Sequence, residues 1–151
     1  LTSAKGLGGG FPIGAILLSN KVAKAIKPGA HGSTFGGNHL ACAVGQSVIS
    51  QIAKKSFLNN VIHKGELLAK GLEKIRVDHN KKINSIHGKG LMLGINCKIS
   101  NLKLNEEVRN RGLLLVPASN NILRILPPLN VTIKEIKKAL EIINNSLKEI
   151  N

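Results

Sequence analysis

A lysine surrounded by glycines near the start of the chain constrains the fold more than any other feature. Residues 3–14 read SAKGLGGGFPIG, with glycines at positions 6, 8, 9 and 10 close to Lys5. Glycine reaches backbone angles closed to other residues and lets a ligand or another backbone come near the main chain. The run therefore predicts a tight turn that holds an amine at a site, the setting of a lysine that carries a covalent cofactor.

The alternative is a solvated surface lysine beside a flexible glycine linker. The residues that follow oppose this alternative, because a linker would stay polar. Residues 11–19 (FPIGAILLS) become apolar at once and have the length and the bounding residues of a buried strand. We therefore expect the glycines to form a turn that leads into folded chain.

The length of 151 residues suffices for one domain with a core, or for the end of one domain and a small second one. The chain begins at Leu1 within the glycine motif, so we expect a fragment of a longer protein. The mean hydropathy is +0.06, and no apolar run approaches the roughly 20 residues of a membrane span. We expect a soluble, cytoplasmic protein that has no membrane partner.

The net charge of +14 makes a basic nucleic-acid-binding module the main non-enzyme alternative. The basic residues are spread along the chain and form no dense tract. Aromatic residues make up 2% of the chain, all of them phenylalanine, so little is available to stack on bases. We therefore expect no nucleic-acid partner.

The cysteines and histidines predict no metal site. Cys42 and Cys97 are single and far apart, which favours free buried thiols in a reducing compartment. The histidines are not at metal-ligand spacings, so turn or surface positions are expected for all of them: His31, His39, His63, His79 and His87.

Hydrophobic periodicity and turn residues predict the elements along the chain. Helices are expected over residues 21–26, 40–52, 59–75 and 105–111, and strands over residues 91–97, 113–116 and 122–125. Residues 85–90 read as a glycine turn that leads into the strand at 91–97. Thr132 and Glu135 form the pattern of a capping box, which opens a final helix whose apolar face contains Ile136, Leu140, Ile143 and Leu147. The second half therefore predicts a small α+β domain.

A loop rich in hydroxyls and glycine is the second candidate binding feature. Residues 31–38 read HGSTFGGN, so the neighbouring Ser33 and Thr34 precede a predicted helix. Hydroxyl and backbone N–H groups in such a loop can donate to a phosphate or a carboxylate. The alternative is an ordinary loop with an N-terminal cap for the next helix.

Arg124 is the third candidate, because it lies alone in the apolar run 121–129, NILRILPPL. A buried guanidinium without an anion partner is costly, so the arginine either pairs internally or binds a substrate carboxylate, which its planar group can hold with two hydrogen bonds. An internal ion pair and an exposed edge position are the structural alternatives.

Together these three segments, in this order, resemble the class III aminotransferases, which depend on pyridoxal 5′-phosphate (PLP). The resemblance implies an α/β fold, the PLP-dependent transferase fold type I, also called aspartate-aminotransferase-like. Residues 1–55 would be the C-terminal end of the large PLP-binding domain with a bridging helix, and residues 56–151 the small C-terminal α+β domain.

The resemblance also implies a role for each candidate residue. Lys5 would be the cofactor-binding and catalytic lysine, and Thr34 would donate to the PLP phosphate of the neighbouring subunit in a homodimer. Ser33 and Arg124 would bind substrate. The family usually has proline where this chain has His39, a change expected to alter the rigidity of the loop more than the chemistry.

Residues 32–34 with 121–124 and 127–129 look most like the members that transfer the δ-amino group of N-acetylornithine to 2-oxoglutarate in arginine biosynthesis. Some of these also use N-succinyl-diaminopimelate in lysine biosynthesis. Ornithine and 4-aminobutyrate aminotransferases are the alternatives within the family, and a non-catalytic relative kept as an oligomer partner is a further one. Asp78 is the only aspartate, and the family's acidic partner of the pyridine nitrogen belongs to an upstream segment. We therefore expect the isolated fragment to be inactive.

Overall fold

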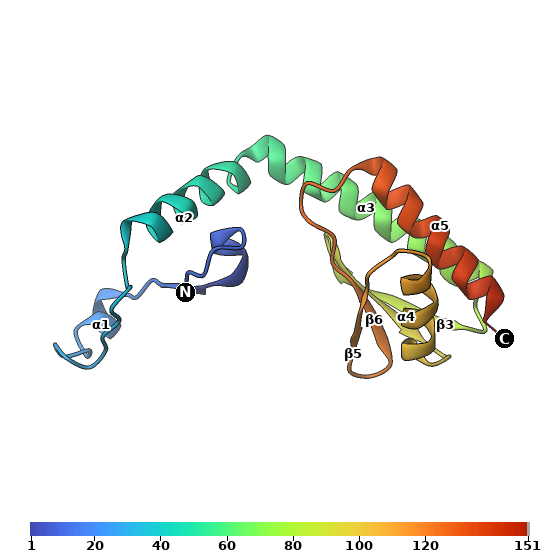
Figure 1. Ribbon diagram of the computed structural model, residues 1–151, viewed down its shortest axis with the longest axis horizontal. Coiled ribbons are helices and arrows are strands. Elements are labelled where there is room, and N and C mark those ends of the chain that lie inside the picture. The colour runs from blue at the N-terminus through green and yellow to red at the C-terminus, as the bar shows by residue number, and fades with distance from the viewer. Residues whose placement is uncertain (151) are drawn as a thin grey trace. The chain divides into compact units, whose positions relative to one another are not determined.

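The computed structural model describes residues 1–150 (Figure 1). The chain divides into two compact units, Leu1–Leu58 and a second unit that begins at Asn59, and each is described by itself. The first unit contains the strands β1 (Thr2–Ser3) and β2 (Ala15–Ile16), the 3₁₀ turn η1 (Lys5–Gly8), and the helices α1 (Asn20–Ala23) and α2 (His39–Ile52). The helix α3 (Lys55–Asp78) begins in the last residues of the first unit and continues into the second unit.

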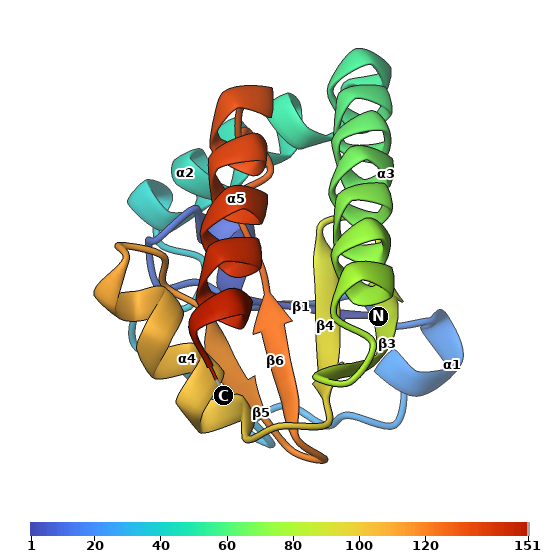
Figure 2. The ribbon, with the colours of Figure 1, turned by 90° about the vertical axis from the view of Figure 1, so that its right-hand side faces the viewer.

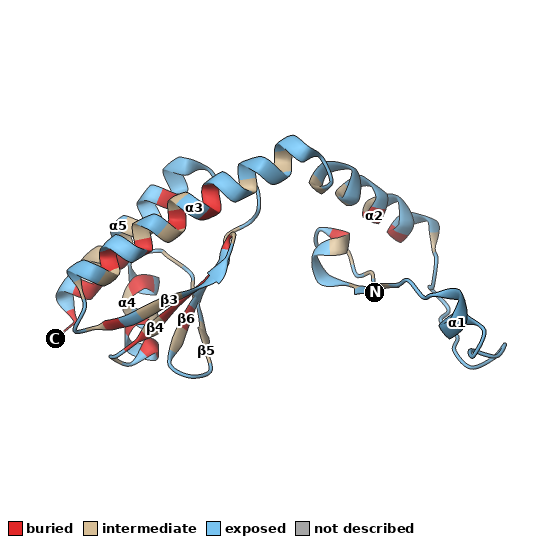
Figure 3. Ribbon diagram, turned by 180° about the vertical axis from the view of Figure 1, so that it is seen from behind, coloured by how far each residue is buried: buried red, intermediate tan, exposed pale blue. Residues whose placement is uncertain are grey.

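The predicted buried strand at residues 11–19 is wrong for this chain. Only β2 is a strand there, and it pairs antiparallel with the two residues of β1. Ile16, Leu17 and Leu18 are 68%, 61% and 45% exposed. A two-stranded ribbon this short buries little by itself, and Figure 3 shows that most of the first unit is exposed.

Helix α2 packs small residues against the segment of the lysine turn. Ala41 and Gly45 are the buried residues of this helix. A Cβ added at Gly45 would lie 3.5 Å from Ile13 Cδ1 and 3.9 Å from the carbonyl oxygen of Leu7. Cys42 follows Ala41 and lies off this packed stripe, so its thiol is exposed, and the prediction of a buried thiol is wrong at this position.

The second unit is a four-stranded antiparallel sheet covered on one face by helices. The strands are β3 (Ile83–Lys89), β4 (Met92–Cys97), β5 (Val116–Ala118) and β6 (Ile122–Ile125), and their order in the sheet is β3-β4-β6-β5. Besides α3, the helices are α4 (Asn101–Asn110) and α5 (Ile133–Glu149). Figure 2 shows α3 and α5 side by side in front of the sheet, with α4 next to α5 on the side away from α3.

Alternation along the strands places one set of side chains in the core. Leu93 and Ile95 of β4 and Leu123 and Ile125 of β6 belong to a single cluster that also contains residues of all three helices. Met92 and Arg124, which alternate with these core residues along β4 and β6, are exposed on the open face. The predicted small α+β unit is therefore confirmed.

Local capping fixes the start of α5 as predicted. The Thr132 hydroxyl accepts from the backbone N–H of Glu135, and the Glu135 carboxylate accepts from the backbone N–H of Thr132, so both halves of the capping box are present. Ile136, Ile143 and Leu147 are buried and Leu140 is partly buried.

The end of α5 is closed by a distant side chain. The Lys82 ammonium donates to the carbonyl oxygen of Leu147 at 2.7 Å and also to that of Ile150. Lys82 immediately precedes β3, so this contact ties the last turn of α5 to the connection between α3 and the sheet.

Candidate active site

Lys5 lies at the start of η1 with a backbone conformation that few residues other than glycine adopt. Its φ is +54°, in the left-handed region, and its side chain is exposed. The backbone N–H of Leu7 donates to the carbonyl of Ala4, and that of Gly9 donates to the carbonyl of Gly6, which closes the turn. A non-glycine residue held in this region stores strain, which is found most often at functional sites.

Three of the glycines after Lys5, at positions 8, 9 and 10, are required by the turn itself. A Cβ at Gly8 would lie 2.8 Å from Ile13 Cγ2, too close for any side chain. Gly9 and Gly10 have φ values of +55° and +114°. The predicted tight turn is thus confirmed, and the flexible-linker alternative does not describe this structure.

The hydroxyl-rich loop ends in a helix cap. The backbone N–H of Gly36 donates to the carbonyl of Ser33, and the Asn38 side chain accepts from the backbone N–H of Ala41 at 2.9 Å. His39 is the first residue of α2. Ser33 and Thr34 are exposed, and within residues 1–150 neither hydroxyl makes a hydrogen bond. Both hydroxyls are therefore free to bind a ligand.

The first unit contains a hollow of about 380 Å³. It lies between the chain that follows the lysine turn and the start of α2, and the residues that line it include Pro12, Gly14, Ser33, Asn38 and Cys42. The structure therefore brings Ser33 to this hollow. Lys5 and Thr34 are not among the lining residues.

Arg124 is exposed on the open face of the second unit. Its strand β6 is paired on both sides, with Gly94 of β4 and Val116 of β5 as the cross-strand partners of Arg124. The two ion pairs found within residues 1–150 join Arg76 to Glu73 and Arg111 to Glu107. The expected burial of Arg124 is therefore wrong, and so are both structural alternatives, the internal ion pair and the edge position.

These residues fit a cofactor that carries an aldehyde and a phosphate. The Lys5 amine is exposed and has no ion-pair partner within residues 1–150, so it can bind an aldehyde carbon. The free hydroxyls of Ser33 and Thr34 are donors suited to phosphate oxygens. A Cβ added at Gly6 or Gly32 would meet no atom within 4 Å, so there is open space beside both segments.

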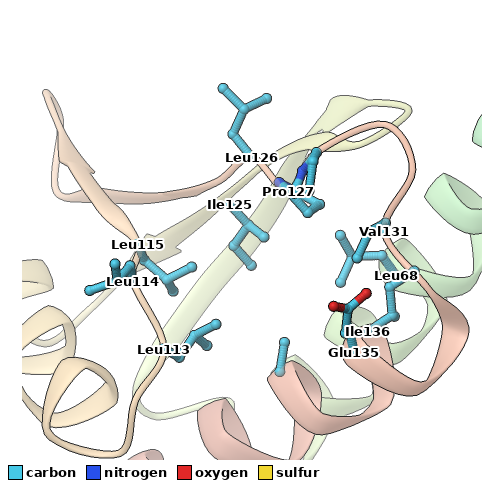
Figure 4. A pocket seen from close by; sticks show the side chains of 12 residues that line it. Leu68, Leu113, Leu114, Leu115, Ile125, Leu126, Pro127, Val131, Glu135 and Ile136 are labelled. Atoms are coloured by element: carbon cyan, nitrogen blue, oxygen red, sulfur yellow. The ribbon is translucent and has the colours of Figure 1, made fainter. Parts of the chain in front are cut away.

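An apolar cleft in the second unit was not predicted from the sequence. Figure 4 shows it between leucine and isoleucine side chains from α3, α5, the end of β6 and residues 113–115, and its volume is about 240 Å³. Glu135 is the only charged residue among those that line it, and its carboxylate is already bound by Thr132. The run Leu113-Leu114-Leu115, which lines the cleft, is the sequence feature that could have indicated it. The cleft offers no free polar group for catalysis.

Cys97 and Glu135 are among the ionisable groups of the second unit whose pKa values are shifted. Burial raises the pKa of the Cys97 thiol to about 11, so this thiol stays protonated and unreactive at neutral pH. Hydrogen bonds from the Thr132 backbone and hydroxyl lower the pKa of the Glu135 carboxyl. Within residues 1–150 there is no group of three or more metal-binding side chains, and no helix is long and apolar enough to cross a membrane.

Comparison with known proteins identifies the family. The class-III aminotransferase family model matches residues 1–147, so the chain belongs to this family. A curated relative, the acetylornithine aminotransferase of Mesorhizobium japonicum, is 45% identical over 145 residues, which are 96% of this chain and 36% of that protein. The chain therefore spans little more than a third of the length of this relative.

Solved structures agree with the predicted fold. The acetylornithine aminotransferase of Elizabethkingia anophelis matches with a TM-score of 0.88 and 32% identity, over 99% of this chain and 38% of that one. An ornithine aminotransferase of Toxoplasma gondii, with PLP partly occupying its active site, matches with a TM-score of 0.88 and 29% identity, over 97% and 36%. The expected α/β fold of the PLP-dependent transferases is confirmed.

Proposed function

We propose that the protein to which this chain belongs is a PLP-dependent aminotransferase that transfers the δ-amino group of N-acetylornithine to 2-oxoglutarate. The observation that carries the proposal is the strained, exposed Lys5 in its glycine turn, in a chain of the class III family. The fold does not separate the candidate substrates, because the acetylornithine and ornithine enzymes match with the same TM-score of 0.88. The sequence favours N-acetylornithine through the 45% identity to the Mesorhizobium enzyme.

Lys5 performs two tasks in this proposal. Its Nζ binds the cofactor aldehyde, and after the substrate amine replaces it, the same nitrogen removes the proton from the amine-bearing carbon and returns it at the next step. PLP, when bound, supplies the electron sink that makes this proton acidic. Because the tight turn already fixes the backbone of Lys5, only side-chain freedom is lost when its amine binds, which favours both tasks.

The remaining candidate residues bind the cofactor phosphate and the substrate. The Thr34 hydroxyl donates to the cofactor phosphate of the neighbouring subunit in a homodimer, and Ser33 contacts the substrate. The Arg124 guanidinium holds a substrate carboxylate with two charge-assisted hydrogen bonds, for which its exposure and its lack of an ion-pair partner within residues 1–150 leave it free. We place the enzyme in the cytoplasm and in arginine biosynthesis, with N-succinyl-diaminopimelate of lysine biosynthesis as a second amino donor.

The cofactor assignment is tested on the full-length protein by adding PLP, reducing with borohydride and mapping the pyridoxyl mass on peptides. We expect the label on Lys5, and we expect a Lys5→Arg variant to carry none at that peptide. Label scattered over surface lysines in the wild-type protein would reject Lys5 as the cofactor lysine.

The substrate assignment is tested by initial rates with 2-oxoglutarate and four amines: N-acetylornithine, N-succinyl-diaminopimelate, ornithine and 4-aminobutyrate. We expect the highest kcat/KM with N-acetylornithine. A marked preference for unacetylated ornithine would move the protein to the ornithine aminotransferases, which the likeness to the Toxoplasma structure keeps as the second candidate.

A further inference from the structure

Two asparagines tie the start of strand β6 to the rest of the second unit. The Asn121 amide donates to the carbonyl oxygens of Cys97 and Ile99, both at 2.7 Å. Its own side-chain oxygen accepts from the backbone N–H of Asn101 at 2.8 Å. One exposed side chain therefore holds three backbone groups in the segment that joins β4 to α4.

Asn101 completes the connection from the other side. Its side-chain amide donates to the carbonyl oxygens of Ala118 at 3.2 Å and Ile122 at 2.9 Å, one in each strand of the β5–β6 hairpin. Asn101 is 8% exposed, so these bonds are shielded from water and are stronger than they would be on the surface. We call Asn101 and Asn121 together the asparagine clasp.

The clasp acts on the strand that carries Arg124. In β6 the residues on either side of Arg124 are core residues, Leu123 at 0% and Ile125 at 3% exposure. Because side chains alternate between the two faces of a sheet, a shift of the pairing by one residue would move Arg124 into the core and a leucine or isoleucine out of it. A shift by two would take Arg124 away from Gly94, the one residue of β4 without a side chain.

The hairpin contributes few ladder hydrogen bonds of its own to hold this register. Strand β5 has only three residues and β6 has four. The loop between them places Asn120 and Asn121 at φ values of +58° and +57°. Both residues adopt the left-handed conformation that asparagine tolerates, but within residues 1–150 only Asn121 uses its side chain to bind the neighbouring segment.

We infer that Asn121, through the asparagine clasp, is a positioning residue that sets the register of β6 and so places Arg124 for the carboxylate of the substrate. This inference rests on the proposed function, since it assumes that Arg124 binds that carboxylate. Asn121 touches no substrate in this scheme and acts only through Arg124.

The test compares two neighbouring substitutions in the full-length holoenzyme. Asn121→Gly keeps a residue suited to the left-handed conformation and removes the three side-chain hydrogen bonds. Asn120→Gly makes the same backbone change in the same loop, where no side-chain bond is lost within residues 1–150. The difference between the two variants therefore isolates the clasp.

For Asn121→Gly we expect the KM for 2-oxoglutarate to rise about tenfold, as when one charge-assisted bond is lost, with kcat changed much less. The dissociation constant of glutarate, measured by titration calorimetry, should rise in parallel. Asn120→Gly should leave both values near those of the wild type. A lower melting temperature for Asn121→Gly with unchanged KM and glutarate affinity would mean a purely structural role and would overturn the inference.

A second variant keeps the test decisive if Asn121→Gly fails to fold. Asn101→Ala removes the two bonds to Ala118 and Ile122 and leaves Asn121 in place, so it should raise the same KM in the same direction. An unchanged KM in Asn101→Ala would also overturn the inference. A wild-type protein with no turnover of any of the four amines would instead reject the proposed function, and the positioning role would fall with it.

Discussion

Arg124 of β6 lies directly opposite Gly94 of β4 in the antiparallel ladder between these strands. A Cβ at position 94 would lie 2.8 Å from Ile122 Cγ2, so the sheet has no room for a side chain there. The arginine is therefore exposed beside a strand position that consists of backbone alone. This pairing leaves the guanidinium accessible on the open face without a neighbouring side chain from β4 at the same level.

Replacement of Arg124 should separate substrate binding from stability. Arg124→Gln removes an exposed side chain that makes no ion pair within residues 1–150, so the free energy of unfolding should change by less than about 0.5 kcal/mol. The KM for 2-oxoglutarate should rise roughly tenfold to a hundredfold, because a hydrogen bond to a charged group contributes about 1.5–3 kcal/mol. Chemical denaturation and steady-state kinetics on the full-length enzyme check both expectations. A loss of several kcal/mol of stability would show a structural role instead.

The glycines of the second unit provide a matched test of packing against backbone strain. Gly88 has a φ of +120°, and its added Cβ would lie 2.1 Å from the carbonyl oxygen of Met92. Gly112 has a φ of +83°, and its added Cβ would meet nothing within 4 Å. Gly112→Ala should therefore cost about 1–3 kcal/mol from backbone strain alone, and Gly88→Ala should cost clearly more or prevent folding. Urea denaturation of the two variants measures the difference, and equal losses would contradict the described β3–β4 turn.

The capping box should make stability depend on acid pH. The pKa of Glu135 is lowered from 4.5, mainly by the hydrogen bond from the Thr132 backbone. A carboxyl whose pKa is lower in the folded state adds stability above its unfolded pKa, and this stability is lost as the pH falls through the folded value. The advantage of the wild type over Glu135→Gln in melting temperature should therefore be constant near neutral pH and shrink below about pH 4.5.

Glu141→Gln is the control for this titration. Glu141 is an exposed residue of the same helix and makes no hydrogen bond or ion pair within residues 1–150. Its replacement should leave the melting temperature nearly unchanged at every pH. A similar pH-dependent loss in both variants would reflect the net charge of the helix and not the capping box.

The two cysteines should differ in reactivity. Cys97 is buried and its pKa is raised to about 11, so at pH 8 it is a protonated, inaccessible thiol. We expect native protein to show no alkylation of Cys97 by iodoacetamide, and rapid alkylation once urea unfolds the second unit, as read by peptide mass. Alkylation of Cys97 in native protein at the rate of an unfolded control would contradict the described core.

The sequence predicts the second unit best where the determinants are local. The capping box of α5 needs only Thr132 and Glu135 three residues apart, and β6 was predicted with its observed bounds. Strand β3 was missed because Gly88 and Gly90 suggested a turn across residues 85–90, whereas pairing with β4 extends the strand to Lys89. That pairing is a tertiary effect, and no single-sequence pattern contains it.

The candidate site was predicted less completely, because burial depends on which layer covers a strand. The apolar residues 11–19 and the arginine in residues 121–129 both suggested burial. In the structure Leu17 is exposed because β2 has only the short β1 as its partner, and Arg124 is exposed because the helices cover the opposite face of its sheet. The asparagine clasp joins residues 20 apart in the chain, so it could be recognised only in three dimensions.

The closure of α5 by Lys82 makes the last turn of this helix dependent on the rest of its unit. The carbonyl groups of Leu147 and Ile150 receive their donor from a residue 65 and 68 positions earlier, and not from a cap within the helix. A synthetic peptide with the sequence of α5 would keep its capping box and would still fray at this end. In the intact protein the amide protons of this turn should be protected from solvent exchange only after the connection between α3 and β3 has formed. The end of the helix thus reports on the folding of a segment that was synthesised long before it.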